Sequence, residues 1–459
     1  MSSELAPNYL VKTFVYKGNY YVYDTQTNTL LQILKEHFIV LERFLKKGFP
    51  TNTDKLALSN YEKDIVMLQQ RGMFKNSIVE KVENPYLNSV ESFLKGSVHD
   101  MTLQVTRQCN FDCRYCLYAG EEHIEREHEN KNMSIATAYK SIDFLFDHSY
   151  DAEKINISFY GGEPLLNFKL IKSCVKYAEK KFYSKQIEFS MTVNGSLLDE
   201  EKIMFFIEHD FKLSISLDGP EVIQDSHRKF RNTGEGTFGV VMKNITYIRD
   251  NYSDFFNNNL EFMPVVMDNE NYEIVSSFFE KIGVKKAKLS PLKANLNGVD
   301  YYLSSASHID NSSLKFIDRE SPGINDTAFI SLKRIYDNKK CISSTWHHNG
   351  QCIPGIQRIF VDCDGVFYPC EKIIENETLQ IGNVQTGFNL SKIKEMLCIG
   401  KLLEDRCKKC WAMRFCEICV SLCLDVDRNQ FSKDMKVIAC KAQENNALWL
   451  FKKLIDKSN

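Results

Sequence analysis

Three cysteines within eight residues are the feature of this sequence with the clearest chemical meaning. The stretch "TRQCNFDCRYCLY" places Cys109, Cys113 and Cys116 with three and then two intervening residues. Such spacing can wrap one loop around a soft metal centre, supplying three thiolates and leaving a fourth coordination position unfilled by nearby protein. A closed structural zinc site needs a fourth ligand, so a zinc knuckle is the alternative interpretation.

Composition supports a metal role for these thiols. The 459 residues include 15 cysteines, and 58 basic and 60 acidic side chains give a net charge of -2. This balance does not indicate a nucleic-acid partner, and without an apolar membrane span or signal peptide we expect a cytoplasmic protein. Because the cytoplasm is reducing, clustered cysteines there are ligands or redox groups more often than disulfides.

Strand and helix patterns alternate through the region that contains the three cysteines. Alternation of this kind predicts an α/β fold with a parallel sheet, closed into a complete or partial barrel. The predicted strands span residues 101–106, 154–162, 187–195, 212–220, 260–267 and 285–292. In such barrels the chemistry lies at the carboxyl ends of the strands. The cysteines, Gly161 to Pro164, Asn194 with Gly195, and Asp218 all follow strands, so we expect them to face one mouth.

Two other regions flank this predicted barrel. Residues 9–25 show two β-rich runs, and residues 30–48 and 54–74 show helical spacing of apolar residues. These features predict a small N-terminal α+β module, joined to the barrel by a polar, proline-containing linker over 83–97. On the other side, eleven cysteines lie between Cys341 and Cys440.

With these residues in view, the chain resembles the radical S-adenosylmethionine (SAM) superfamily, and within it the SPASM branch, over roughly residues 98 to 445. Cys109, Cys113 and Cys116, with Tyr115 before the last cysteine, match the motif that holds a [4Fe-4S] cluster with one open iron. In that family the open iron binds SAM, which is cleaved reductively to a 5'-deoxyadenosyl radical.

The resemblance also implies residues around SAM. Gly161, Gly162 and Glu163 in "GGEP" match the second motif, where glycine lets the backbone approach closely and the carboxylate faces the cofactor's ammonium. The other matching positions lie near the methionine carboxylate or the ribose, and they are Asn194, Ser216, Asp218 and Arg228. Asn-Gly and Asp-Gly-Pro are also common turn formers, so a loop-shaping role stays open.

The C-terminal cysteines resemble the SPASM extension, which binds two auxiliary [4Fe-4S] clusters in that family. The resemblance assigns the outer cluster to four residues, Cys407, Cys410, Cys416 and Cys440. It assigns the inner cluster to Cys352, Cys370 and either Cys419 or Cys423, because Val420 stands where the family has a cysteine. Cys341 is the candidate for the fourth inner ligand; otherwise that iron is open and could bind a substrate thiolate.

Three further cysteines are expected to have a structural role and no role as ligands. Cys174 and Cys398 lie in predicted helices and Cys363 alternates with Val361 in a strand, so small core residues are expected there. His347 and His348 are adjacent, and adjacent side chains rarely converge on one ion, which favours a loop role.

Together these features predict a partial (β/α)6 TIM-like radical SAM barrel over residues 96–320. A cysteine-rich SPASM domain over 321–459 follows it, and a winged-helix-like module over 1–90 precedes it. The N-terminal module resembles the peptide-recognition element of maturases that act on ribosomally made peptides, which pairs a leader segment with a sheet edge.

The predicted activity is maturation of a ribosomally synthesised precursor peptide by formation of a thioether cross-link. SAM, three [4Fe-4S] clusters and a flavodoxin- or ferredoxin-type reductant are the implied cofactors and partner, with no nucleic acid and no membrane. Two enzymatic alternatives are anaerobic sulfatase maturation to formylglycine and carbon-carbon peptide cyclisation. A non-enzymatic alternative is an iron-sulfur or zinc scaffold that binds peptides.

Overall fold

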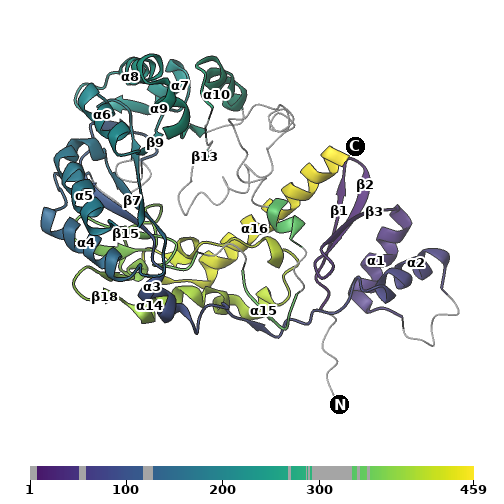
Figure 1. Ribbon diagram of the computed structural model, residues 1–459. Helices are drawn as coiled ribbons and strands as arrows, with labels where there is room; N and C mark the ends of the chain where they lie inside the picture. The colour runs from purple at the N-terminus through teal and green to yellow at the C-terminus, as the bar shows by residue number, and fades with distance from the viewer. Residues whose placement is uncertain are drawn as a thin grey trace.

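The chain folds into an open sheet covered by helices, a cysteine-rich region packed against that sheet, and a small N-terminal module. The computed structural model describes residues 8–50, 58–116, 128–266, 270–285, 287, 290–291, 333–338, 342–348 and 352–458. In Figure 1 the C-terminal helix α16 (Lys433–Ser458) runs from the cysteine-rich region to the N-terminal strands.

Six parallel strands, beginning at one edge, form the larger part of a nine-stranded sheet. In spatial order they are β11 (Leu260–Phe262), β9 (Lys212–Ile215), β8 (Gln186–Val193), β7 (Lys154–Gly161), β5 (Asp100–Thr106) and β15 (Ile359–Val361). The predicted parallel α/β architecture is therefore confirmed, and the strands expected at 101–106, 154–162, 187–195 and 212–220 are β5, β7, β8 and β9. Alternate residues of β7 are buried, as expected for a strand in a covered sheet.

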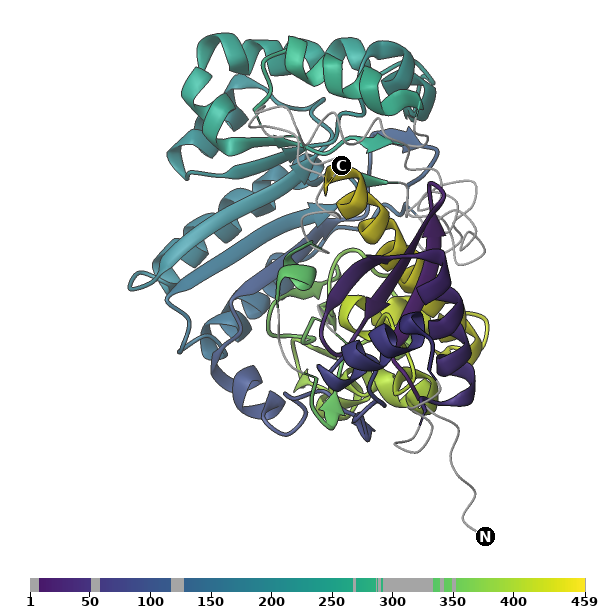
Figure 2. The ribbon, with the colours of Figure 1, turned by 90° about the vertical axis from the view of Figure 1, so that its right-hand side faces the viewer.

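Helices connect these strands and lie along the outer face of the sheet, as Figures 1 and 2 show. They are α4 (Ile135–Asp147), α5 (Phe168–Lys181), α6 (Glu200–Glu208), α7 (Glu221–His227), α8 (Phe238–Asn251), α9 (Ser253–Asn259) and α10 (Glu270–Lys281). Ser134 and Asp199 cap α4 and α6, each accepting a hydrogen bond from a backbone N–H three residues on.

The sixth strand of the parallel sheet differs from the one expected. Residues 260–267 divide into β11 and β12 (Val265–Val266), and β12 pairs with β13 (Ser290–Pro291) in a separate two-stranded sheet. The parallel partner on the free side of β5 is instead β15, whose Ile359 lies opposite Met101. Strands β16 (Val366–Tyr368), β17 (Gly382–Asn383) and β18 (Gly387–Phe388) continue the sheet in antiparallel fashion. The cysteine-rich region and the barrel region thus share one sheet, across the expected boundary at residue 320.

The N-terminal module contains three strands where two were expected. It consists of β1 (Val11–Tyr16), β2 (Asn19–Asp24), β3 (Thr29–Ile33), α1 (Lys35–Lys47) and α2 (Asn60–Gln70). Residues 29–33 were expected to begin a helix, and this expectation is wrong because a turn at Asn28, which has a φ of 53°, brings them alongside β2. Asp24 stabilises this turn by accepting a hydrogen bond of 2.9 Å from the Thr27 N–H. The proposed linker also contains a helix, α3 (Val90–Gly96).

Both faces of this small sheet are covered. Val22 packs with Leu41 and Phe44 of α1, while the neighbouring Tyr23 points the other way and lies 4.5 Å, between ring centroids, from Phe451 of α16. The Thr25 hydroxyl donates a 2.6 Å hydrogen bond to the Trp411 carbonyl. The module is therefore packed against the cysteine-rich region by side chains of alternate strand residues.

The remaining elements of the cysteine-rich region are short. They are β14 (Thr345–Trp346), which pairs with β4 (Lys81–Val82), η4 (Glu377–Leu379), α14 (Leu390–Leu397), η5 (Ile399–Leu403), α15 (Glu404–Cys407), η6 (Met413–Phe415), η7 (Val420–Cys423), β19 (Leu424–Asp425) and β20 (Gln430–Phe431). Within the described ranges, no helix has the length and apolar character needed to cross a membrane.

Replacing Phe451 by alanine should weaken the contact between the N-terminal sheet and α16. Phe451 is fully buried, and truncating a buried phenylalanine costs about 3–5 kcal/mol. We therefore expect faster deuterium exchange of the β1 and β2 amides, measured by mass spectrometry. Val15→Ala, at a strand position that is 52% exposed, is the control and should leave exchange unchanged. Equal exchange in both variants would contradict this account of the interface.

Candidate active site and cysteine clusters

The loop that carries the first three cysteines is held in place at its centre by strand pairing. It leaves β5 and forms β6 (Phe111–Cys113), which pairs antiparallel with β10 (Arg228–Phe230) so that Cys113 lies opposite Arg228. The Arg114 N–H donates a 3.0 Å hydrogen bond to the His227 carbonyl, just beyond this pair. All three cysteines are partly buried.

The glycine-rich turn after β7 packs directly on this loop. The Gly162 N–H donates to the Thr106 carbonyl at 3.1 Å, and the Glu163 N–H donates to the Gln108 carbonyl at 2.8 Å. A Cβ on Gly162 would lie 2.2 Å from the Gln108 oxygen, and one on Gly161 would lie 2.0 Å from the Thr106 oxygen. Glycine is thus required at both positions by the backbone of the cysteine loop itself.

The Glu163 side chain joins the ends of two strands. It is fully buried, and its two carboxylate oxygens accept hydrogen bonds from the Asn194 N–H at 2.7 Å and the Leu165 N–H at 3.1 Å. Burial raises the pKa of this carboxyl to about 7, although both backbone bonds favour the ionised form. The Glu163 carboxylate therefore holds the turn after β7 against the end of β8.

Asp218 and Arg228 form a buried ion pair that supports the last part of the loop. The Arg228 Nε and Nη2 donate to the two Asp218 carboxylate oxygens at 2.9 and 3.0 Å. The Tyr115 hydroxyl donates to the same carboxylate, and the Arg228 guanidinium lies 5.2 Å from the centre of the Tyr115 ring. Three residues selected from sequence as cofactor contacts are therefore bonded to one another, beside Cys113 and Cys116.

Asn194 is connected to the cysteine loop through a residue that the sequence analysis missed. Its side-chain amide donates to the Asn110 side-chain oxygen at 2.8 Å, and the Asn110 amide donates to the Ser196 hydroxyl at 2.9 Å. Ser216 is half-buried at the end of β9, where its N–H donates to the Val193 carbonyl at 2.9 Å. The position of Asn110 between two candidate ligands was its only sequence signal.

The three thiols of this loop share a largely buried environment. Burial raises the pKa of the Cys109 thiol and brings that of Cys113 to about 12, so binding of a metal centre there would have to be coupled to loss of the thiol protons. Within the described ranges, no three His, Cys, Asp or Glu side chains converge closely enough to hold one metal ion.

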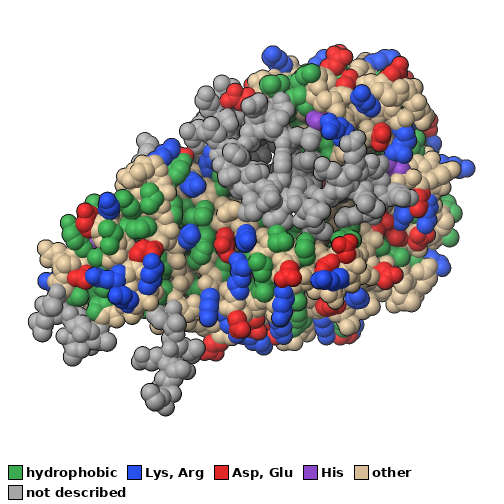
Figure 3. Space-filling model, turned by 180° about the vertical axis from the view of Figure 1, so that it is seen from behind, with side chains coloured by type: hydrophobic (Ala, Val, Ile, Leu, Met, Phe, Trp, Pro, Cys, Tyr) green, Lys and Arg blue, Asp and Glu red, His purple; other side chains and the backbone are tan. Residues whose placement is uncertain are grey.

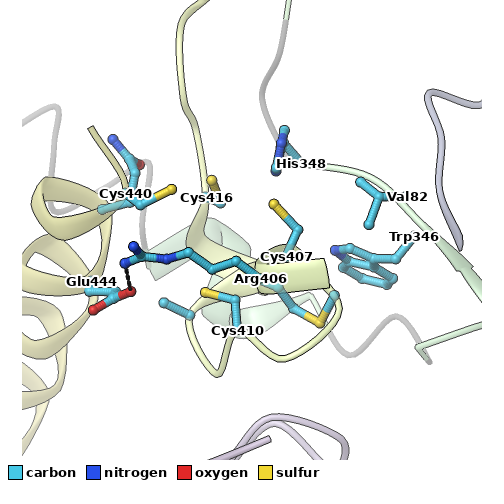
Figure 4. A pocket seen from close by; sticks show the side chains of 12 residues that line it. Val82, Trp346, His348, Arg406, Cys407, Cys410, Cys416, Cys440 and Glu444 are labelled. Carbon is cyan, nitrogen blue, oxygen red and sulfur yellow. Dashed lines mark hydrogen bonds and ion pairs between the residues drawn. The ribbon is translucent and has the colours of Figure 1, made fainter. Parts of the chain in front are cut away.

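Four cysteines of the C-terminal region surround one cavity. They are the residues assigned from sequence to the outer cluster, Cys407, Cys410, Cys416 and Cys440. Figure 4 shows their side chains around a common space, with Trp346 and His348 on the side away from α16. The sequence spacing and the folded arrangement therefore select the same four thiols.

The cysteines assigned to the inner cluster divide between two environments. Cys352 and Cys419 are exposed and lie near enough for charge on Cys419 to raise the pKa of the Cys352 thiol, after the larger effect of burial. Cys423 is fully buried. Burial raises the pKa of its thiol to about 12, and charges on Cys440, Cys419 and Cys407 contribute to this increase. Cys370 is partly exposed at the end of β16, and Cys341 lies outside the described residues.

The cysteines interpreted as structural have no ligand-like grouping. Cys174 is fully buried in α5, and the Cys363 thiol donates to the Gln104 carbonyl at 3.1 Å. Cys398 is half-buried at the end of α14. Both ring nitrogens of His347 lie 3.2 Å from backbone carbonyl oxygens, those of His348 and Leu397.

The cysteine loop, the glycine turn packed on it and most strands of the parallel sheet lie in a part of the chain that resembles a known family. Residues 103–282 match the family model described as the Radical SAM superfamily, and they run from β5 to the end of α10.

Particular relatives extend this comparison. An uncharacterized protein of Methanocaldococcus jannaschii is 33% identical over 196 residues, which are 42% of this chain and 62% of that protein. The cysteine-type anaerobic sulfatase-maturating enzyme of Clostridium novyi is 25% identical over 320 residues, 66% of this chain and 82% of that enzyme. The solved structure of native anSMEcpe with bound AdoMet has a TM-score of 0.61 at 20% identity, covering 78% of this chain and 99% of that one, which shows the likeness of fold. The match to the M. jannaschii protein therefore spans less than two thirds of the length of that relative.

Gly162→Ala should prevent normal cluster binding at the first three cysteines. The new Cβ would meet the Gln108 carbonyl, so either the glycine turn or the cysteine loop must move. We expect iron after anaerobic reconstitution to fall from about twelve to about eight atoms per chain, measured by mass spectrometry of the metal. Gly239→Ala in α8, where a Cβ meets nothing within 4 Å, should keep the full iron content. Full loading of the Gly162 variant would contradict this role of the turn.

Proposed function

We propose that this protein is a radical SAM maturase that cross-links a ribosomally made precursor peptide through a cysteine thioether. The observation that carries the proposal is the N-terminal module, in which the outer strand β3 borders a groove with apolar residues in its lining, on the same chain as the region that matches the radical SAM family. The domain limits that we propose are residues 1–90 for leader recognition, 96–320 for the radical SAM core and 321–459 for the SPASM region.

In this proposal Cys109, Cys113 and Cys116 hold a [4Fe-4S] cluster through three of its irons. The remaining iron would bind SAM, which supplies a 5'-deoxyadenosyl radical for hydrogen abstraction when it is reduced. The residues proposed around SAM are Tyr115, Gly161, Gly162, Glu163, Asn194, Ser216, Asp218 and Arg228. Because the Glu163 side chain and the Asp218–Arg228 pair are buried and bonded, we infer that they act by fixing the loop and the turn.

Two auxiliary [4Fe-4S] clusters complete the proposed cofactors. Cys407, Cys410, Cys416 and Cys440 line one cavity, which supports the outer site. For the inner site we propose Cys352, Cys370 and Cys419, because Cys419 shares the exposed environment of Cys352 while Cys423 is buried. Cys423 remains the second candidate and Cys341 the candidate fourth ligand. A flavodoxin- or ferredoxin-type protein is the proposed reductant.

The edge of β3 is suited to pairing with an extended peptide. Strand β3 is an outer strand of the three-stranded sheet, with β2 as its neighbour. Beside it lies a groove whose lining includes Leu31 and Ile33 of β3 and Ile65 and Leu68 of α2. Strand addition uses the backbone for affinity and such pockets for side-chain selection. Figure 3 shows both hydrophobic side chains and Lys and Arg side chains on the surface at this end of the molecule.

A thioether requires that the substrate lose a hydrogen atom from carbon, a proton from the cysteine thiol and one further electron. A cluster in the cysteine-rich region could accept that electron. The auxiliary cysteines would then hold the electron acceptor of this reaction. Carbon-carbon cyclisation would need the same acceptor, so the chemistry of the product must be measured.

Sulfatase maturation is the second candidate. The C. novyi relative is named as a cysteine-type sulfatase-maturating enzyme, and the alignment with it extends over most of that enzyme. The anSMEcpe structure, however, is covered almost completely while 22% of this chain lies outside the match. Additional chain beyond that fold favours an enzyme that holds its substrate at a second place.

Cofactor cleavage provides the first test of the proposal. The protein, reconstituted anaerobically with iron and sulfide, should bind about twelve irons and release 5'-deoxyadenosine when SAM and dithionite are added. The Cys109→Ala, Cys113→Ala and Cys116→Ala triple variant should release none yet retain about eight irons. Bound zinc without cleavage would instead indicate a peptide-binding scaffold.

Substrate class can then be decided with a panel of cysteine-rich precursor peptides and a sulfatase peptide. Loss of two hydrogens from a precursor that persists after treatment with a thiol reductant, with resistance of one cysteine to alkylation, would identify a thioether. Oxidation of the sulfatase peptide alone would overturn the choice made here.

Adding charge to the groove should weaken leader binding without affecting cofactor cleavage. Leu34 and Met67 line the groove and are 58% and 42% exposed, so Leu34→Glu and Met67→Glu should be tolerated by the fold. We expect at least a tenfold loss in affinity for the leader of a modified precursor, about 1.4 kcal/mol, measured by fluorescence anisotropy. Ile39→Glu, equally exposed on α1 but outside the groove lining, is the matched control. Unchanged affinity in the groove variants would place leader binding elsewhere.

A further inference from the structure

Lys436 is a buried cation in the cysteine-rich region. It lies in the first turn of α16 and is fully buried. Its Nζ donates to the carbonyls of Ile399 at 2.7 Å and Gly400 at 3.0 Å, and lies 3.7 Å from the sulfur of Cys407. Lys436 precedes Cys440 by four residues, so both side chains leave the same face of the helix. The ammonium is therefore in contact with the outer group of cysteines.

No carboxylate among the described residues forms an ion pair with this ammonium. Transfer of an unpaired ammonium from water into a protein interior costs several kcal/mol. The position adds to this cost, because the first turn of a helix favours negative rather than positive charge. The two carbonyls supply dipoles only, so the sulfur of Cys407 is the one contact that can carry a full negative charge.

A second polar group faces the same cavity. The Nε2 of His348 is buried and has no hydrogen-bond partner within the described part of the chain. His348 lines the cavity together with Cys407, Cys410, Cys416 and Cys440, and Figure 4 places it next to Cys407. Buried polar atoms are rarely left without partners, so this nitrogen indicates that the cavity is built around a bound group.

We propose that Lys436 is the buried counter-charge of the outer auxiliary cluster and that it raises the reduction potential of that cluster. The inference rests on the proposed function, which assigns a [4Fe-4S] cluster to Cys407, Cys410, Cys416 and Cys440. With four thiolates bound, the oxidised cluster is anionic, and one-electron reduction adds a further negative charge. A fixed ammonium beside one thiolate stabilises the reduced form more than the oxidised form, as charge and hydrogen bonding do at iron-sulfur sites generally.

The expected consequence is a cluster that readily accepts the electron released when a substrate radical closes on a thiol. The electron comes from the substrate, the cluster is reduced by one electron, and the thiol proton leaves to solvent or a base. Lys436 takes part as a positioning residue, since it contacts a cluster ligand and no reacting atom.

A redox titration of the reconstituted full-length protein, followed by electron paramagnetic resonance, tests this inference. The outer-cluster signal is first identified as the one lost in Cys410→Ser. Lys436→Met should then make its midpoint potential more negative, with at least a tenfold change in the one-electron equilibrium, about 59 mV. Lys441→Met removes the same charge from an exposed position beside Cys440 and should leave the potential unchanged.

A second measurement covers the case in which Lys436→Met does not load its cluster. Protein labelled with 15N at the lysine side chain should show a nitrogen coupling to the reduced outer cluster in pulsed resonance spectra. That coupling should vanish in labelled Lys436→Arg, whose arginine is unlabelled but keeps the charge.

The outcomes separate this inference from the proposed function. If Cys410→Ser removes neither iron nor a resonance signal, the outer cluster itself is wrong. If the outer cluster is present but its potential is unchanged in Lys436→Met, or the wild-type protein shows no lysine coupling, the cluster assignment stands and the role of Lys436 is overturned.

Discussion

The contact between the glycine turn and the cysteine loop is the constraint on which the active site depends. Two backbone hydrogen bonds join Gly162 and Glu163 to the loop, at a separation that leaves no room for a Cβ. The loop is held on its other side by the pairing of β6 with β10, and the turn is held by the Glu163 carboxylate. The backbone of the cysteine loop is thus positioned by contacts with the glycine turn on one side and with β10 on the other.

Much of this arrangement could be predicted from the sequence because it depends on local patterns. Strands β5, β7, β8 and β9 each show apolar character and end in a polar turn, and parallel strands bring such turns to one edge. The four outer cysteines were grouped through the family resemblance, and in the structure they line one cavity. The contacts that the charged residues of the site make could not be read from the sequence. Glu163 bonds to the backbone of Asn194 and Leu165, and Asp218 pairs with Arg228.

The features that could not be predicted depend on contacts between distant parts of the chain. Residues 29–33 have apolar spacing compatible with a helix, and only pairing with β2 makes them a strand. Nothing in the sequence around Ile359 indicates that β15 joins β5. The sequence around Lys436 does not indicate burial, which follows from the packing of η5 and α15 against this side chain. Asn110 and His348 carried no signal beyond their proximity to cysteines.

The pairing of β15 with β5 has a consequence for how the protein is made. Strand β5, which leads into the first cysteine loop, keeps one edge unpaired until residues 359–361 have left the ribosome. During synthesis the growing chain therefore exposes the backbone along one edge of β5, a position open to wrong strand partners. The sheet that carries the first cysteine loop is complete only after the start of the cysteine-rich region has been made. A chain truncated before residue 359 would leave this edge of β5 without its partner, far from the point of truncation in the sequence.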